Sequence, residues 1–290
     1  MPTSNIARRM DGNAVAATVL QRLSGRVEAV RAQRGSAPRL GVVLFGNNGS
    51  SLSYIRKKQE SAKMVGIEVV LLHQEDVTDA AVAKEELRAF QENERLDGLI
   101  VQLPLPSSMR ASTREILDVI DPSLDVDCLT SVCQSRLADG DLLVVPPTPA
   151  SILALLEAYD VDLDGKRVVL VGHGTLVGKP LAALLPGTGA AVTICDRETP
   201  DLLACTLEAD VVISATGVPG LIIGEMLKEG VVVVDAGTAI ESGGVAGDVD
   251  TLSVESVASL VSPVPGGVGP LTVAKLLENV VELAERFSSR

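Results

Sequence analysis

The chain has 290 residues, a net charge of −13 and 46% hydrophobic residues, but only 2% aromatic residues. This length suggests about two domains with aliphatic cores. The acidic charge argues against a nucleic-acid-binding protein, which needs a basic face. No apolar run reaches the roughly 18 residues of a membrane span, and the N-terminus lacks the apolar stretch of a secretory signal. We therefore expect a cytoplasmic protein with neither a nucleic-acid nor a membrane partner.

The cysteine pattern does not favour a metal site. Cys128, Cys133, Cys195 and Cys205 form no CxxC pair, and the chain has only two histidines. Structural zinc sites need closely spaced Cys and His ligands. We expect reduced, mostly buried thiols and no bound metal.

Short runs rich in Val, Leu and Ile alternate with helical patterns, a rhythm typical of parallel α/β sheets. The runs are almost continuously apolar, as in strands that are covered on both faces. In chain order, the predicted strands are Leu40–Phe45, Glu68–Leu72, Leu99–Leu103, Arg167–Val171, Ala191–Cys195, Val211–Ser214 and Val231–Asp235.

These strands fall into two groups, separated by the proline-stiffened "PPTPAS". Thr148 is the predicted N-cap of the helix that begins there, with Pro149 at its first position. The last predicted helix, Thr272–Phe287, has one apolar stripe that could return to the first group. We expect two α/β domains flanking a cleft, the second a Rossmann-like doubly wound parallel sheet. Residues 1–147 plus 272–290 would form the first, and residues 148–271 the second.

The segment "SSLSYIRKKQESAKMVGI" is predicted to be a helix of the first domain. Tyr54 and Lys58 stand at i and i+4, so both point from one face beside the apolar stripe. A ring and an amine there could stack a planar substrate and move a proton, if desolvation or hydrogen bonding favours the neutral amine. The alternative is a solvated Arg56-Lys57-Lys58 run beside an interfacial tyrosine.

Two further polar groups belong to the predicted first domain. Gln102 ends the strand of "LDGLIVQLPLP" on the side where ligands bind in open α/β sheets, unless it only satisfies loop backbone. In "LDVDCLT", Asp125 and Asp127 share a side if the segment is extended. Turn or helix-capping acids are the usual explanation of such a pair.

The segment "KRVVLVGHGTLVGKPLAALL" is predicted to be a strand, a glycine turn and a helix. Gly172 can supply the tight turn, and Gly174 lets the backbone approach a pyrophosphate at the helix N-terminus. The spacing G-x-G-x-x-x-G is one residue longer than the usual fingerprint, so an ordinary strand–helix turn is the alternative.

Asp196 and Arg197 follow the next strand, where a ribose contact is expected about 20 residues on. An acid favours the ribose diol of NAD, whereas an arginine favours the 2′-phosphate of NADP, so the cofactor choice stays open. The segment "ISATGVPG" places small residues at the carboxyl end of another strand, where ligands bind in such sheets.

Near the C-terminus, "SPVPGGVGPLT" combines three prolines with three glycines just before the last helix. Proline fixes φ, and glycine opens conformations that other residues avoid. This pattern indicates a rigid backbone segment that something approaches closely.

Taken together, the chain resembles the bifunctional methylenetetrahydrofolate dehydrogenase/cyclohydrolase family over nearly its whole length. The matching segments are "SLSYIRKK", "DGLIVQLPLP", "DVD", "PTP", "DGKRVVLVGHGTLVGKP", "ISATGVPG", "GDVD" and "PVPGGVGPLTVAKLLENV". The resemblance implies oxidation of 5,10-methylenetetrahydrofolate to 5,10-methenyltetrahydrofolate with NADP, or with NAD, and then hydrolysis to 10-formyltetrahydrofolate. It also implies one-carbon metabolism, purine biosynthesis and a homodimer formed through the nucleotide domain.

The same resemblance implies roles for individual residues. Tyr54 would stack on the folate, Lys58 would transfer protons, Gln102 would orient Lys58, and Asp127 would hold the pterin. Further substrate contacts would come from Ser51 and from the loop that lines the folate cleft, at Pro265, Gly266, Gly267, Val268, Gly269 and Pro270. Cofactor contacts would come from Thr148, Gly172, His173, Gly174, Thr175, Val177, Gly178, Asp196, Arg197, Ala215, Thr216 and Gly217.

Several positions depart from the family pattern. His173 and Gly174 replace the usual arginine and serine, which removes one anchor for the cofactor's phosphates. Cys128 stands where the family usually has glycine, and "PPTPAS" replaces "PCTPxG". A regulatory protein that kept the cleft but lost catalysis is therefore an alternative. Another is a dehydrogenase of the shikimate type, although that type would not predict "VQLPLP" or "PVPGGVGPLT".

Overall fold

The computed structural model describes residues 6–241 and 244–287. The chain divides into two compact units. The first unit contains Ala17–Pro147 and the chain from Val273 onward, and the second contains Thr148–Thr272 and the chain up to Ala16. In the part of the chain that the structure describes, no helix is long and apolar enough to cross a membrane.

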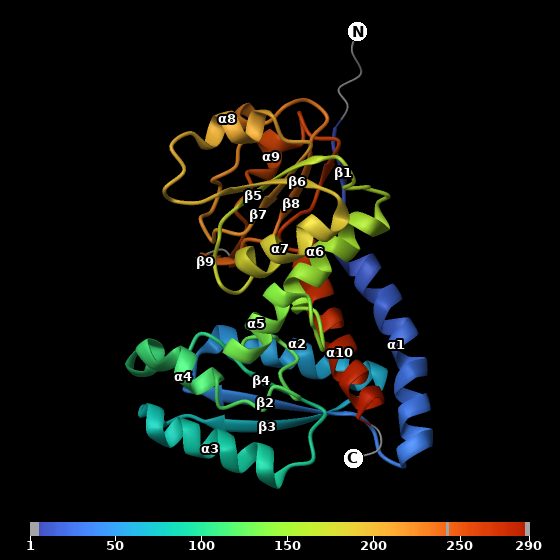
Figure 1. The fold of residues 1–290 in the computed structure, drawn as a ribbon, viewed down its shortest axis with the longest axis vertical. Coiled ribbons are helices and arrows are strands. Elements are labelled where there is room, and N and C mark those ends of the chain that lie inside the picture. Colours follow the sequence, from blue (N-terminus) through green and yellow to red (C-terminus); the bar gives the residue numbers. More distant parts are fainter. Residues whose placement is uncertain (1–5, 242–243, 288–290) are drawn as a thin grey trace. The chain divides into compact units, whose positions relative to one another are not determined.

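The first unit is built on a three-stranded parallel sheet in the order β3-β2-β4 (Figure 1). Alternate residues of β2 point to opposite faces. Leu40, Val42 and Leu44 join one core cluster, whereas Val43 and Phe45 join another. The strands are β2 (Arg39–Phe45), β3 (Glu68–Gln74) and β4 (Gly98–Val101).

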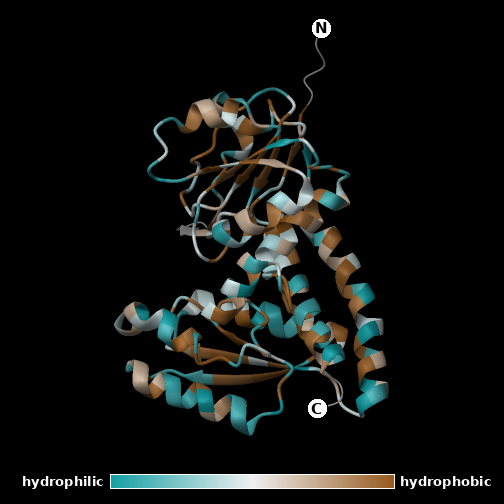
Figure 2. Cartoon of the chain, viewed as in Figure 1, coloured by the Kyte–Doolittle hydropathy of each residue, from teal (hydrophilic) through white to brown (hydrophobic). Residues whose placement is uncertain are grey.

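Helices cover both faces of this sheet. The first cluster draws side chains from α1, α2 and α10, and the second draws them from α3 and α4. The helices are α1 (Gly12–Arg34), α2 (Gly49–Val65), α3 (Ala80–Asn93), α4 (Thr113–Leu117), α5 (Ser131–Asp139) and α10 (Val268–Arg286). Figure 2 shows the strands of both units as mainly hydrophobic, in accord with strands that are buried on both faces.

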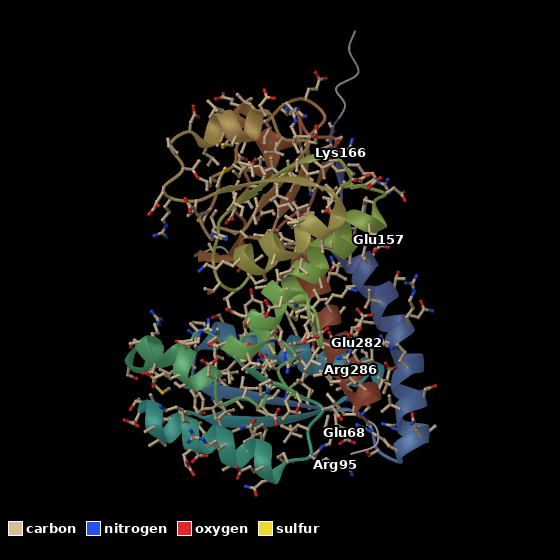
Figure 3. The ribbon with its side chains drawn as sticks, in the orientation of Figure 1. Glu68, Arg95, Glu157, Lys166, Glu282 and Arg286 are labelled. Atoms are coloured by element: carbon tan, nitrogen blue, oxygen red, sulfur yellow. The ribbon has the colours of Figure 1, made fainter. Side chains whose placement is uncertain are left out.

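Charged side chains add to the packing of α10 against α1. Arg26 pairs with Glu285 at 2.7 Å and with Glu278 at 3.6 Å. Glu282, labelled on α10 in Figure 3, is half-buried, and burial raises the pKa of its carboxyl. Helix α10 is thus held against α1 by ion pairs, in addition to the apolar stripe that it contributes to the first unit's core.

The second unit is a six-stranded, fully parallel sheet in the order β1-β11-β8-β7-β5-β6. The chain passes from β5 to β6 on one side and then to β7 on the other side of β5. The carboxyl ends of β5 and β7 therefore mark the topological switch point, where doubly wound sheets bind ligands. The strands are β1 (Arg8–Arg9), β5 (Arg167–Val171), β6 (Ala191–Cys195), β7 (Val211–Ser214), β8 (Val232–Asp235) and β11 (Leu260–Val261).

Helices flank this sheet on both sides (Figure 1). The inner strands are buried on both faces, as the adjacent β5 residues Val168 and Val169 show, which are 0% and 3% exposed. A short antiparallel hairpin, β9 (Ala239–Glu241) and β10 (Gly244–Ala246), lies apart from the sheet. The helices are α6 (Pro147–Ala158), α7 (Gly178–Leu184), α8 (Leu202–Leu207) and α9 (Thr251–Val254).

Three details differ from the sequence-based expectations. The chain up to Ala16 belongs to the second unit rather than the first, because β1 pairs with β11 at the sheet's edge. Helix α6 begins at Pro147, so Thr148 lies inside its first turn and is not the N-cap. Proline suits a first helical position because its missing N–H would be unpaired there in any case. Helix α10 begins at Val268, and so takes Gly269 and Pro270 into its first turn.

Candidate active site

Helix α2 brings three candidate residues to one face of the first unit. Asn48 caps the helix, accepting from the backbone N–H groups of Ser50 and Ser51. Ser51, Tyr54 and Lys58 then follow at i, i+3 and i+7, a spacing that aligns them on one side. Ser51 is buried, and its Oγ has no hydrogen-bond partner among the described residues. The hydroxyl is thus both buried and unpaired among these residues.

Lys58 is hydrogen-bonded to the end of the central sheet. Its Nζ donates to Gln102 Oε1 at 3.1 Å. Gln102 is fixed in turn, because its Nε2 donates to Leu103 O at 2.8 Å and its backbone N–H donates to Val43 O at 2.8 Å. Gln102 does bond loop backbone, as the alternative for this residue supposed, but the other end of its amide accepts from the amine.

Asp127 lies in the electrostatic field of this amine. Burial lowers the pKa of Lys58, and the Asp127 carboxylate opposes that effect. Burial likewise raises the pKa of Asp127, with Lys58 lowering it and Asp125 raising it. Burial therefore shifts the pKa of each group toward its neutral form, and for Lys58 this favours an amine that can accept a proton.

The two acids of "DVD" have different surroundings. Asp125 is 1% exposed, and its oxygens accept from Leu129 N at 3.1 Å and Thr130 N at 2.8 Å. It is thus a turn acid that closes the loop, as such acids usually are. Cys128 has a φ of 56°, the left-handed region that glycine occupies without strain. This cysteine therefore occupies a turn whose backbone conformation favours glycine.

Sequence reasoning missed the residue that supports this loop from the far end of the chain. Asn279 is 5% exposed and sits on α10. Its Nδ2 donates to Val126 O at 2.9 Å and to Val145 O at 2.8 Å. A buried amide within an otherwise apolar stripe is the signal that could have revealed it.

The glycines of the proline-rich loop are explained by contacts within the second unit. Gly266 has a φ of 107°, and its carbonyl accepts from Gly12 N at 2.8 Å. A Cβ on Gly267 would lie 2.6 Å from Pro263 O, and one on Gly12 would lie 1.7 Å from Gly267 O. The close approach predicted from the sequence is thus made, at these two positions, by the chain itself. At Gly269 an added Cβ would meet no described atom within 4 Å.

The predicted cofactor residues meet at the switch point of the second unit. Gly172 N donates to Cys195 O at 2.8 Å, and a Cβ on Gly172 would lie 2.5 Å from Ala215 O. A Cβ on Gly178 would lie 2.2 Å from Gly172 O. These contacts pack the turn after β5 tightly between the ends of β6 and β7, which only glycine permits.

Gly174 has different surroundings. An added Cβ there would contact none of the described atoms within 4 Å. The backbone at this position is open, as a pyrophosphate site requires. His173 and Thr175 are exposed on either side, and Val177 stands at the N-cap of α7. The turn therefore fits a dinucleotide.

Asp196 and Arg197 both lie exposed just beyond β6. Asp196 Oδ1 accepts from Glu198 N at 2.9 Å, and Asp196 N donates to Thr199 Oγ1 at 2.8 Å. The aspartate thus keeps one oxygen for a ligand and uses the other to hold its own turn. Thr148 lies in α6 of the same unit.

Two buried acids near Ala215, Thr216 and Gly217 were not assigned from the sequence. Asp248 Oδ2 accepts from Thr216 N at 2.6 Å, and Asp235 Oδ1 accepts from Asp248 N at 3.0 Å. The "GDVD" segment, which contains Asp248, is one of the segments that resemble the family, but its residue pattern gives no sign that Asp248 is buried.

Three of the four cysteines, Cys128, Cys133 and Cys195, are buried, as predicted. Among the described residues, no three His, Cys, Asp or Glu side chains are grouped closely enough to hold a metal ion.

The fold and these two groups of side chains define an α/β enzyme that combines a dinucleotide-binding sheet with a separate unit carrying a half-buried lysine paired with a glutamine. Two family models match the chain. One, described as tetrahydrofolate dehydrogenase/cyclohydrolase, NAD(P)-binding domain, covers residues 146–288, and the other, the catalytic domain of the same family, covers residues 10–127. The chain belongs to the tetrahydrofolate dehydrogenase/cyclohydrolase family.

Individual relatives agree with this assignment. The bifunctional protein FolD of Lacticaseibacillus paracasei is 40% identical over 282 residues, which are 97% of this chain and 99% of that protein. The bifunctional FolD dehydrogenase/cyclohydrolase of Campylobacter jejuni has a TM-score of 0.90 and 35% identity, covering 97% of this chain and 99% of its own. The Trypanosoma brucei FolD, solved with NADP and an inhibitor, has a TM-score of 0.90 and 33% identity over 99% of each chain.

The chain is accordingly an NAD(P)-dependent methylenetetrahydrofolate dehydrogenase and methenyltetrahydrofolate cyclohydrolase. This finding supports the bifunctional enzyme over a dehydrogenase of the shikimate type.

Proposed function

We propose that Lys58 is the proton-transfer group of the cyclohydrolase step. The observation that carries this proposal is the 3.1 Å bond from Lys58 Nζ to Gln102 Oε1, made by an amine whose pKa is lowered by burial. A neutral amine can donate one N–H to Gln102 and still present its lone pair to water. Gln102 therefore aims the lone pair, and Asp127 tunes the amine's protonation.

Hydrolysis then follows a balanced sequence. Water adds to the methenyl carbon of the cationic substrate while Lys58 Nζ takes one of its protons. The resulting ammonium returns that proton to the ring nitrogen as the carbon–nitrogen bond breaks. The hydroxyl left by the water loses its remaining proton to solvent and becomes the formyl carbonyl, so the products are 10-formyltetrahydrofolate and one proton. The cationic substrate favours a neutral amine beforehand, because like charges disfavour one another.

Substrate binding is assigned to two sets of residues. On α2, Tyr54 stacks on the folate, and the unpartnered Ser51 hydroxyl accepts or donates a hydrogen bond to it. Asp127 binds the pterin, whose N–H groups complement a carboxyl. In the second unit, the assigned substrate residues are Pro265, Gly266, Gly267, Val268, Gly269 and Pro270.

The dehydrogenase step needs orientation more than acid–base chemistry. NAD(P), when bound, supplies the hydride acceptor. The open backbone at Gly174 would hold its pyrophosphate, and the segment Ala215–Gly217 would lie beside it at the switch point. His173, Thr175, Val177, Gly178 and Thr148 complete the assigned set.

We propose NADP as the preferred cofactor. Arg197 is exposed at the end of β6 and can pair with a 2′-phosphate, while one oxygen of the opposing Asp196 is already engaged by Glu198 N. The Trypanosoma brucei relative, described as complexed with NADP, supports the same choice.

The direct test is an assay with 5,10-methylenetetrahydrofolate and either cofactor. Reduction of the nicotinamide and hydrolysis of methenyltetrahydrofolate should both be measurable, with the lower KM for NADP. Turnover without hydrolysis would contradict the role of Lys58, and a lower KM for NAD would contradict the cofactor assignment.

We further propose a cytoplasmic homodimer that supplies 10-formyltetrahydrofolate for purine biosynthesis. Support for a dimer comes from β6, which has a strand partner on one side only among the described residues and exposes 42% of Ile194. Such edges invite pairing with a second chain. Sedimentation of the wild type should give a dimer, and Ile194→Lys should shift it toward the monomer; a monomeric wild type would contradict the proposal.

A further inference from the structure

Two buried carboxylates, Asp235 and Asp248, lie at the carboxyl edge of the second unit's sheet and have no role in the chemistry described above. Asp235 ends β8 and is 1% exposed, and Asp248 is 0% exposed. Burying a carboxylate is costly unless it is hydrogen-bonded, so each must be held by nearby donors. Their partners link the two candidate binding loops of this unit.

Asp248 holds the candidate cofactor loop. Its Oδ2 accepts from Thr216 N at 2.6 Å and from Ser214 Oγ at 2.8 Å. Its Oδ1 has no hydrogen-bond partner in the described part of the chain, and it packs against Gly237, where an added Cβ would lie only 2.1 Å away. The carboxylate is thus wedged between the ends of β7 and β8.

Asp235 holds Asp248 in place. Its Oδ1 accepts from Asp248 N at 3.0 Å and Gly237 N at 2.8 Å, and its Oδ2 accepts from Val249 N at 3.0 Å. Three backbone donors satisfy this acid, even though its burial raises its pKa to about 6. At neutral pH the ionised form accepts all three bonds.

The network continues toward the proline-rich loop. Asp235 N donates to Ser262 Oγ at 2.8 Å, and Ser262 directly precedes Pro263. A Cβ on Gly267 would lie 3.0 Å from Ser262 Cβ, so the loop folds back onto this serine. One buried chain of bonds therefore runs from Ser262 through Asp235 and Asp248 to Thr216.

We propose that Asp248 is a positioning residue for the cofactor-binding segment at Thr216, and that Asp235 sets this segment in register with the substrate loop that follows Ser262. The inference rests on the proposed assignment of those two loops. Charge-assisted bonds to backbone N–H groups are short and directional, which suits carboxylates to fixing loop geometry. An apolar side chain in place of Asp248 would leave the Thr216 N–H without its buried acceptor.

The test compares Asp248→Ala, Asp248→Asn and Gly237→Ala with the wild type. Asp248→Ala removes both acceptors, and Asp248→Asn keeps one oxygen. Gly237→Ala keeps the carboxylate but displaces it together with the Asp248 backbone nitrogen, which would lie 2.6 Å from the added Cβ. Gly187→Ala is the matched control, because its added Cβ meets no described atom within 4 Å and its φ is not positive. Each protein is measured by calorimetric titration with NADP, by steady-state kinetics and by hydrogen exchange of the Thr216 peptide.

We expect Asp248→Ala and Gly237→Ala to raise the Kd and KM for NADP by about tenfold, the loss of one charge-assisted bond. Exchange should accelerate at the Thr216 peptide only, and the KM for methenyltetrahydrofolate should stay within about twofold of the wild type. Asp248→Asn should recover part of the affinity, and Gly187→Ala should match the wild type.

Two results would overturn the proposal: NADP affinity within twofold of the wild type in both disruptive variants, or faster exchange throughout the second unit, which would make the acid a fold residue only. If Asp248→Ala does not fold, the same readouts on Asp248→Asn and Gly237→Ala decide. A wild type that binds no NADP would instead refute the cofactor assignment, whereas protection of the Thr216 amide would still report on Asp248.

Discussion

Lys58 on α2 and Gln102 at the end of β4 are 44 residues apart in the chain, and their side chains meet at 3.1 Å. The bond joins a helix to the carboxyl edge of the first unit's sheet. It fixes the direction of an amine that burial shifts toward its neutral form. The predictions for the cyclohydrolase step all depend on this pair.

Replacing the amine should separate the two activities. Lys58→Met keeps an apolar stem of similar length but has no amine to accept a proton. We expect hydrolysis of methenyltetrahydrofolate to fall by about 10²–10⁴-fold, the usual contribution of general acid–base catalysis, with the fold retained by circular dichroism. Lys63→Met, an exposed residue of the same helix, is the control. Hydrolysis at the wild-type rate would refute the assignment.

The pH profile of hydrolysis should report the Lys58 pKa. The neutral amine is the active form, so the rate should rise with pH through the Lys58 pKa and then level. Asp127 raises that pKa, and therefore Asp127→Asn should move the rising limb to lower pH. Gln102→Glu places a carboxylate next to the amine, which raises the pKa of the amine. The rising limb of the profile should therefore move to higher pH, by about one pH unit or more.

Opposite shifts of the two profiles would distinguish an electrostatic effect on the Lys58 pKa from a loss of substrate binding. Loss of substrate contacts alone would raise KM in both variants without moving the inflection of kcat. If both variants shift the inflection in the same direction, the electrostatic account is wrong.

Cofactor choice should respond to the charges after β6. Asp196→Ser removes the acid that repels a 2′-phosphate, so the KM for NADP should fall. Arg197→Ser removes the cation that attracts it and should raise the KM for NADP with little effect on NAD. The KM values for both cofactors in both variants provide the measurement. An unchanged or higher KM for NADP in Asp196→Ser would contradict the charge argument.

Two glycines of α1 should respond oppositely to alanine. A Cβ at Gly12 would overlap Gly267 O at 1.7 Å, so Gly12→Ala must displace the proline-rich loop and should cost about 1–3 kcal/mol. Gly25 is exposed with no described atom within 4 Å of an added Cβ, so Gly25→Ala should stabilise the helix by about 0.5–1 kcal/mol. Urea unfolding of both variants decides, and a Gly12→Ala protein as stable as Gly25→Ala would contradict the packing explanation.

Local patterns in the sequence predicted most of the strands. Apolar runs such as Arg167–Val171 and Val211–Ser214 coincide with β5 and β7, because strands buried on both faces must be continuously apolar. The two-residue strands β1 and β11 were missed, since two residues carry no periodic signal. Their pairing depends on contacts between segments about 250 residues apart, as the Arg8↔Leu260 register shows.

The sequence by itself determined the family and the parallel α/β class, and it predicted the candidate amine, amide and glycine turn, because these depend on residue type and short spacing. Only the tertiary structure decided which acid raises the pKa of Lys58, what Gly267 packs against and that Asp248 accepts from Thr216 N. Those contacts join residues that are distant in the chain, and their energies arise from burial and hydrogen bonding, which no local pattern specifies.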